Sequence, residues 1–298
     1  APATTRAPVT TRPATTRPST TQRPNTTPAP NPDYCRDATF DAITQVAGST
    51  YAFRGDKVML LLSDGIAEGW PKYKSDTMFR DLPDNLDAAV HWPESNLGVA
   101  RTYFFKGSLY WRYEARGVVD GYPRQISTGF RGLPDNIDSA FVWSGNDVTY
   151  FTKGGDYYRY TRGDRIVSGY PRDLSLWSGL PSYIDAAFQW TNGRTYFFQG
   201  PNYYRFNDQY FRVDSGYPRM SNYWWLGCPA GSGNLMDEMN DTEHPMEAGE
   251  DSNQFLDIDP ESTDEDLKNV YSGQGHLTAV PLSLVFSFIV SHFVKAFL

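Results

Sequence analysis

Histidine and cysteine are the residue types with the widest chemistry, and their spacing here limits what the chain can catalyse. The four histidines are His91, His244, His276 and His292. A zinc peptidase of the helical His-Glu-x-x-His type needs two histidine ligands one helical turn apart and a glutamate as general base. No two histidines here have that spacing, no Gly-x-Ser-x-Gly occurs, and neither cysteine has a histidine nearby. The sequence therefore predicts no catalytic residue on this chain.

The elements that position these residues are indicated by a fourfold repeat. An aspartate opens each unit, at intervals of 46, 51 and 47 residues: Asp41, Asp87, Asp138 and Asp185. A period near fifty residues, built from short strands, is typical of propeller blades. The fold class predicted is all-β, with four blades that enclose a central channel.

Each unit repeats the same order of strand and turn signals. A Thr-Tyr strand follows the aspartate segment, then a glycine turn, then a third strand in which arginine stands between aromatic residues, as in Tyr157-Tyr158-Arg159-Tyr160. In unit one the third strand is aliphatic, residues 58–62. Strand alternation places the arginine on one face and its aromatic neighbours on the other, so we expect rings to fill the space between blades. A Gly-aromatic-Pro turn then follows in all four units, as at Gly121-Tyr122-Pro123.

The two cysteines, Cys35 and Cys228, lie just before unit one and at the end of unit four. The first and last blades of a ring are neighbours, so we expect these residues to form a disulfide that closes it. Two unrelated buried thiols are the alternative. A disulfide would imply an oxidising compartment.

Charge divides the chain into segments. Residues 1–34 hold four Arg and one Asp, residues 35–228 hold 21 basic and 21 acidic residues, and residues 229–298 hold 13 acidic residues and two Lys. The neutral middle segment gives no electrostatic reason to bind nucleic acid. Residues 1–34 are a Thr/Pro-rich stretch that we expect to be a disordered, O-glycosylated stalk or a bare linker, and residues 229–276 an acidic disordered spacer. Asn25 and Asn240 lie in N-glycosylation sequons.

The final segment, residues 277–298, is apolar and follows the small residues Ser272 and Gly273. This order matches a glycosylphosphatidylinositol (GPI) attachment signal, with Ser272 or Gly273 as the attachment site. A single transmembrane helix is the alternative. Either would place the protein at the cell surface, in contact with the plasma membrane.

Residues 35–228 resemble a hemopexin-like domain, most of all the C-terminal domain of matrix metalloproteinases. The resemblance rests on four blades, a cysteine at each end, Asp-Ala-Ala openings and Gly-Tyr-Pro turns. It implies that the Thr/Pro stretch is the hinge to a catalytic domain that this chain lacks, and that Zn²⁺ belongs to that domain alone. Some membrane-type members carry GPI anchors, which agrees with the tail.

The resemblance also implies a cation in the channel, Ca²⁺ being the expected ion, held by backbone carbonyls of the inner strands. The expected ligands are two residues from each unit: Asp41 and Ile43, Asp87 and Ala89, Asp138 and Ala140, Asp185 and Ala187. Hard cations accept such oxygen ligands. The alternative is that aspartate repeats because it supports the start of the strand, with water in the channel.

Two functions remain open at this point. The first is a docking module of a GPI-anchored matrix metalloproteinase, a zinc- and calcium-dependent endopeptidase acting on extracellular matrix. The domain would bind matrix proteins and protease inhibitor proteins, and could form homodimers. The second is a stand-alone extracellular adhesion protein without protease activity. Haem transport is disfavoured because the predicted folded part holds only His91.

Overall fold

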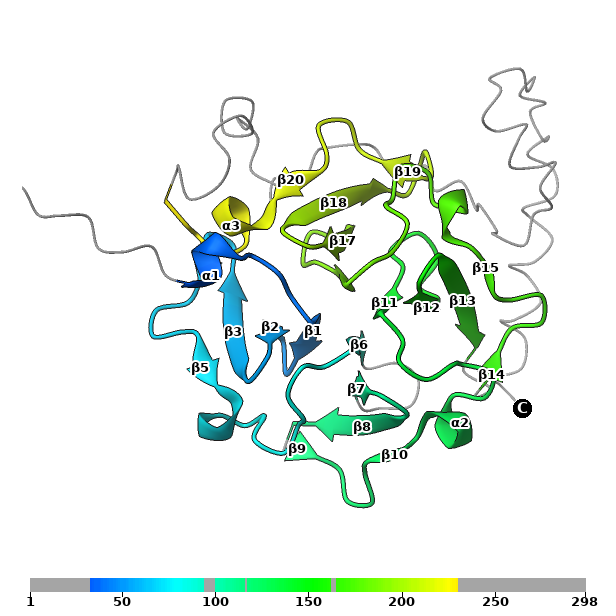
Figure 1. Cartoon of the computed structure of the whole chain (residues 1–298), viewed down its shortest axis with the longest axis horizontal. Coiled ribbons are helices and arrows are strands. Elements are labelled where there is room, and N and C mark those ends of the chain that lie inside the picture. The colour runs from blue at the N-terminus through cyan, green and yellow to red at the C-terminus, as the bar shows by residue number, and fades with distance from the viewer. Residues whose placement is uncertain (1–32, 94–99, 116, 162–164, 230–298) are drawn as a thin grey trace, which may run out of the picture.

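The computed structural model describes residues 33–93, 100–115, 117–161 and 165–229. Four antiparallel sheets of the same topology stand around a central axis, so the predicted four-bladed propeller is confirmed (Figure 1). The innermost strands of the blades are β1 (Ala42–Val46), β6 (Ala88–Trp92), β11 (Ser139–Val142) and β16 (Ala186–Gln189).

Each blade continues outward through two longer strands. The second strands are β2 (Ser49–Arg54), β7 (Arg101–Lys106), β12 (Thr149–Lys153) and β17 (Thr195–Gln199). The third strands are β3 (Lys57–Leu62), β8 (Leu109–Glu114), β13 (Asp156–Thr161) and β18 (Asn202–Asn207). The predicted aliphatic third strand of blade 1 is therefore present as β3.

Two very short strands border the third strand of every blade on its outer side. They are β4 (Gly65–Ile66) and β5 (Lys72–Tyr73), β9 (Gly117–Val118) and β10 (Arg124–Gln125), β14 (Arg165–Ile166) and β15 (Arg172–Asp173), and β19 (Arg212–Val213) and β20 (Arg219–Met220). The Gly-aromatic-Pro turn joins the two members of each pair, and its aromatic–proline peptide bond is cis in all four blades.

Short helical turns lead out of the blades. These are η1 (Lys74–Asp76), α2 (Ile126–Gly129), η2 (Leu174–Leu176) and α3 (Ser221–Trp224), while α1 (Asp33–Arg36) precedes blade 1. Shortly after each of the four turns comes a large aromatic side chain with almost no exposed surface: Phe79, Phe130, Trp177 and Trp225.

Those four rings are the centres of the hydrophobic core, which lies between neighbouring blades. Phe130, for example, has its ring centroid 5.1 Å from that of Phe105 in blade 2 and 5.7 Å from that of Phe151 in blade 3. Trp177 contacts Phe141 of blade 3 and Phe197 of blade 4 at 5.6 and 5.9 Å. Edge-to-face pairs of this kind add to the free energy of burying the rings. The prediction that aromatic rings fill the space between blades is confirmed.

Blades 4 and 1 are joined by the predicted disulfide. Cys35 in α1 and Cys228 are bonded, with 5.7 Å between their Cα atoms. Trp225 packs against Phe198 and Tyr203 of blade 4 directly beside this bond. The helices α1 and α3 lie together at one corner of the disc (Figure 1).

Candidate functional site

The repeated aspartates connect each inner strand to a turn farther out in the same blade. One carboxylate oxygen of each accepts a hydrogen bond from the backbone N–H of the glycine that directly follows the second strand, at 2.6 Å in every blade: Gly55, Gly107, Gly154 and Gly200. Those glycines have φ between +53° and +61°, a conformation that glycine adopts without strain. The four aspartate side chains therefore support the start of each inner strand.

Removing one of these carboxylates should destabilise the domain without changing its fold. Because Asp138 accepts the Gly154 N–H, we expect Asp138→Ala to lower the free energy of unfolding by about 1–2 kcal/mol. Urea unfolding followed by tryptophan fluorescence measures the change. Asp135→Ala is the matched control, since Asp135 is exposed and lies three residues away. Equal stability of the two variants would contradict this role.

The channel itself is bordered by the free edges of the four inner strands. Each inner strand pairs on one side only, with the second strand of its blade, and such an edge presents unpaired backbone carbonyls. Ile43, Ala89, Ala140 and Ala187 line a cavity of about 520 Å³ along this axis. Small side chains at three of these positions let the strands approach, which fits a site built from carbonyl oxygens.

Side chains of the described residues do not form a second kind of metal site. Among the described residues, no group of three or more His, Cys, Asp or Glu side chains could hold an ion. The carbonyl ligand set of Asp41, Asp87, Asp138, Asp185 and their partners thus stays a prediction.

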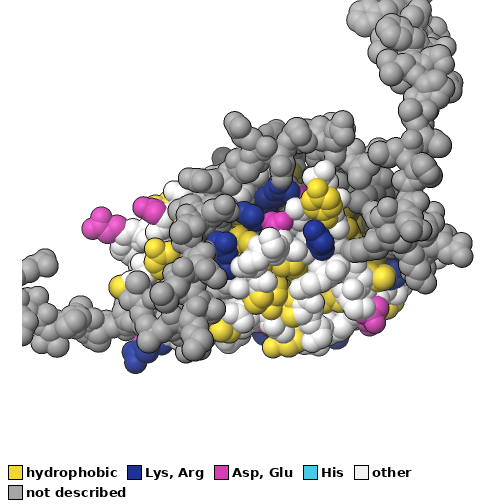
Figure 2. Space-filling view, turned by 90° about the horizontal axis from the view of Figure 1, so that it is seen from above, with side chains coloured by type: hydrophobic (Ala, Val, Ile, Leu, Met, Phe, Trp, Pro, Cys, Tyr) yellow, Lys and Arg dark blue, Asp and Glu magenta, His cyan; other side chains and the backbone are white. Residues whose placement is uncertain are grey.

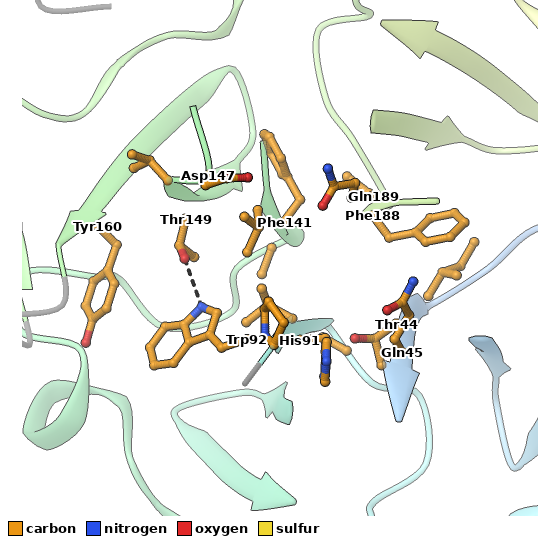
Figure 3. A pocket seen from close by; sticks show the side chains of 18 of the residues that line it. Thr44, Gln45, His91, Trp92, Phe141, Asp147, Thr149, Tyr160, Phe188 and Gln189 are labelled. Carbon is orange, nitrogen blue, oxygen red and sulfur yellow. Dashed lines mark hydrogen bonds between the residues drawn. The ribbon is translucent and has the colours of Figure 1, made fainter. Parts of the chain in front are cut away.

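Four residues at or next to the ends of the inner strands form the mouth of the channel, opposite the aspartate turns. They follow the aspartates by four positions and all line the cavity: Gln45, His91, Val142 and Gln189 (Figure 3). Burial lowers the pKa of His91, so its imidazole is neutral at physiological pH. The sequence analysis did not predict that these four residues lie together, although each stands four positions after one of the repeated aspartates.

A second missed feature is a threonine near the start of the second strand, which binds the preceding blade. The Thr102 hydroxyl donates to the carbonyl oxygen of Gln45 at 2.9 Å. Thr149 accepts from the Trp92 indole N–H at 2.8 Å, and Thr195 accepts from the backbone N–H of Ser144 at 3.1 Å. The repeated Thr-Tyr pair is the sequence signal, but threonine is common in strands for other reasons.

Blades 3 and 4 share a further polar contact at Asp208. Its carboxylate accepts from the Trp143 indole N–H and from the Ser144 hydroxyl, both at 2.7 Å. Burial raises the pKa of Asp208 above its ordinary value of 3.8, and these hydrogen bonds offset only part of that effect. Ionised Asp208 is thus less favoured in the folded than in the unfolded chain.

This raised pKa predicts a pH dependence of stability. Between pH 3.8 and the raised pKa the folded state binds more protons than the unfolded state, so the contribution of Asp208 falls as pH rises through that window. We expect Asp208→Asn to remove that fall, leaving the one from Asp41, whose pKa burial also raises. Urea midpoints measured from about pH 4 to 6 test this. Parallel curves for wild type and variant would show that Asp208 does not titrate in this window.

The predicted modification and anchor sites lie outside the described residues. They are Asn25, Asn240, Ser272, Gly273 and the segment 277–298. Within the part of the chain that the structure describes, no helix is both long and apolar enough to cross a membrane.

Comparison with known proteins agrees with the ring geometry. The Hemopexin family model matches residues 86–135, 137–182 and 184–228, which are blades 2, 3 and 4. Blade 1 lies outside the matched residues, as expected from its aliphatic third strand, yet it has the same sheet topology.

Two groups of curated relatives match part of this chain. Rabbit (Oryctolagus cuniculus) vitronectin is 41% identical over 111 residues, which are 37% of this chain and 22% of vitronectin. Human matrix metalloproteinase-17 is 35% identical over 107 residues, 35% of this chain and 17% of the enzyme. The matched region thus spans less than a quarter of either relative.

Solved structures support the fold alone. The hemopexin fold protein CP4 from cow pea has a TM-score of 0.50 at 22% identity, covering 62% of this chain and 95% of that one. A 2S albumin seed protein from Dolichos gives 0.51 at 21% identity, covering 62% and 96%. Residues 35–228 are therefore a hemopexin-like domain, related to those of matrix metalloproteinases and vitronectin, as the matched repeats, the disulfide and the four-bladed ring together indicate.

Proposed function

We propose that this domain is the docking module of a membrane-anchored extracellular matrix metalloproteinase. The observation that carries the proposal is the match of metalloproteinases to the hemopexin-like repeats, combined with a sequence that holds no His-Glu-x-x-His. The parent would be a zinc- and calcium-dependent endopeptidase that degrades extracellular matrix, and Zn²⁺ would be bound in its catalytic domain. The domain on this chain would contribute binding surface.

The blade rims supply surface suited to protein partners. On the rim of blade 4, basic side chains gather beside acidic and hydrophobic ones (Figure 2). Arg205 pairs with Asp214 at 2.6 Å, and the guanidinium groups of Arg205 and Arg219 lie 5.3 and 4.7 Å from the centre of the Tyr217 ring. Arginine and tyrosine are the residues enriched at binding hot spots.

Binding to immobilised matrix proteins tests the docking role. The full chain should bind collagen or gelatin in surface plasmon resonance, and Arg219→Ala should weaken that binding. Arg124→Ala is the control, since exposed Arg124 lies over the Tyr122 ring of blade 2 as Arg219 lies over the Tyr217 ring of blade 4. Failure to bind any immobilised matrix protein or protease inhibitor protein would contradict the proposal. Sedimentation equilibrium examines the homodimer separately.

The sequence that precedes Ala1 in the full transcript distinguishes the metalloproteinase from the second candidate. A His-Glu-x-x-His-x-x-Gly-x-x-His motif there would support the first. A signal peptide directly upstream would support a stand-alone extracellular binding protein. The higher identity to vitronectin, 41% against 35% for matrix metalloproteinase-17, is the observation that favours the second candidate.

Calcium in the channel is part of the proposal, with backbone carbonyls of the inner strands as ligands. If free calcium exceeds its dissociation constant about a hundredfold, removing it costs about 2.7 kcal/mol, and for a domain of this size Tm falls by about 5–10 °C. Differential scanning calorimetry in EGTA should show the fall, and calcium added back should reverse it. An unchanged Tm would argue against a structural ion.

The membrane anchor is tested on cells that express the protein. Phospholipase C specific for GPI should release it into the medium if Ser272 or Gly273 carries the lipid. Retention after treatment would favour the transmembrane alternative, and with either anchor the untreated protein would stay at the cell surface.

A further inference from the structure

The cavity that runs from the channel to its mouth has the size of a small-molecule site, and the polar side chains at the mouth are groups other than the carbonyl edges that are proposed to hold an ion. The cavity of about 520 Å³ extends from the channel across Trp92 to Thr149, Arg159 and Tyr160 (Figure 3). Small-molecule sites commonly enclose about 300–1,000 Å³. The inference does not depend on the proposed metalloproteinase parent.

Hydrogen bonding assigns the tautomer of His91. The Thr102 hydroxyl has one proton, which it donates to the carbonyl oxygen of Gln45 at 2.9 Å. Its oxygen therefore accepts at the 2.9 Å contact with His91 Nδ1, so the proton of the neutral imidazole is on Nδ1. The second ring nitrogen, Nε2, carries a lone pair and is a hydrogen-bond acceptor.

Two further polar groups of the mouth are unused within the described part of the chain. The side chain of Thr44 lines the cavity although only 2% of the residue is exposed, and its hydroxyl bonds to no described residue. The carboxamide of Gln45 likewise has no partner among the described residues. Thr44 is buried, whereas Gln45 and His91 are half-buried and face the cavity. The Thr44 hydroxyl, the Gln45 carboxamide and His91 Nε2 form a set of donors and acceptors without a partner among the described residues.

Apolar surface stands beside these groups. Trp92 lies at the mouth, held by its hydrogen bond to Thr149 and stacked on Tyr160 at 5.8 Å with 19° between the ring planes. Phe141 and Phe188 form the adjoining wall. The charged residues that line the cavity are Asp147 and Arg159, whose opposite charges give no preference for an anion or a cation.

We propose that the channel mouth binds one residue of a neutral sugar. Sugar hydroxyls donate to His91 Nε2 and to the Gln45 carboxamide oxygen, and accept from the Gln45 N–H and the Thr44 hydroxyl. The C–H face of the ring packs on Trp92. A pyranose combines hydroxyl groups with an apolar face, the pairing that this cavity offers.

Saturation-transfer NMR on the full chain tests the proposal, with the methyl glycosides of glucose, galactose, mannose and N-acetylglucosamine as probes. We expect at least one to bind saturably with a dissociation constant in the millimolar range. Thr44→Val and Gln45→Met, which keep shape and remove polar groups, should each weaken binding about tenfold, equivalent to one hydrogen bond. Thr128→Val, at an exposed position on blade 2, should leave it unchanged.

Three results would overturn the proposal. These are no saturable binding by any probe, equal binding by wild type and both mouth variants, or tighter binding of methyl glucuronide than of methyl glucoside. Thr44→Val and Gln45→Met are both measured so that a folding defect in one does not decide the result. Thermal melts followed by circular dichroism identify such a defect. If the mouth holds only water or stays empty, no probe will bind saturably.

Discussion

Substituting Gly65 by alanine should prevent normal closure of the ring. A Cβ atom at Gly65 would lie 2.7 Å from the Cα of Gly227 and 2.8 Å from its nitrogen, closer than non-bonded atoms approach. Both partners are backbone, so neither can move aside by changing rotamer. With a φ of +128°, alanine also strains the backbone. We expect Gly65→Ala to lower the free energy of unfolding by about 4 kcal/mol or more.

Blade 2 provides the matched control. Gly117 begins β9 as Gly65 begins β4, and its φ of +121° is nearly the same, but a Cβ there meets nothing within 4 Å. Gly117→Ala should therefore show the backbone strain alone, about 1–2 kcal/mol. Guanidinium unfolding of both variants separates the two contributions. Similar losses would mean that contact between Gly65 and Gly227 does not limit closure.

Removing the disulfide should have an effect of similar size. Cys35 and Cys228 are separated by 193 residues in sequence, and a cross-link across so long a loop stabilises by about 5 kcal/mol in the chain-entropy model. The total stability of a domain is commonly about 5–15 kcal/mol. We therefore expect the Cys35→Ser/Cys228→Ser variant to be partly unfolded at 37 °C.

Circular dichroism and the thermal midpoint check this expectation. Wild-type protein treated with a reducing agent should match the double variant, which separates loss of the bond from an effect of serine. An unchanged midpoint would mean that blade packing alone closes the ring. Gly65→Ala and the Cys35→Ser/Cys228→Ser variant act at the same junction, so their effects should not be additive.

The sequence predicts the fold well because the signals repeat. The strand order and the Gly-aromatic-Pro turns recur at fixed places in the units, and the two cysteines stand at the two ends of the repeats. The aliphatic strand of blade 1 forms β3 as expected. The two-residue strands such as β4 and β9 were not predicted, because elements of that length carry no periodic pattern.

The site was harder to predict because its contacts join residues far apart in sequence. Trp92 and Thr149 are separated by 57 residues, and Trp143 and Asp208 by 65. The sequence of one repeat does not reveal that its threonine forms a hydrogen bond with the preceding blade. The aspartates were predicted as part of a cation site, and the position four residues after each one, occupied by His91 in blade 2, was overlooked.

The corner where α1 meets α3 determines how the domain carries mechanical load. Cys35 and Cys228 have Cα atoms 5.7 Å apart, so the chain enters and leaves the ring at almost one point. Tension applied between residues 33 and 229 passes through the covalent disulfide and bypasses the hydrogen bonds of the blades. The blades therefore lie outside the path of the force. A pull strong enough to extend an unfolded protein chain would leave the propeller folded until the sulfur–sulfur bond is cut.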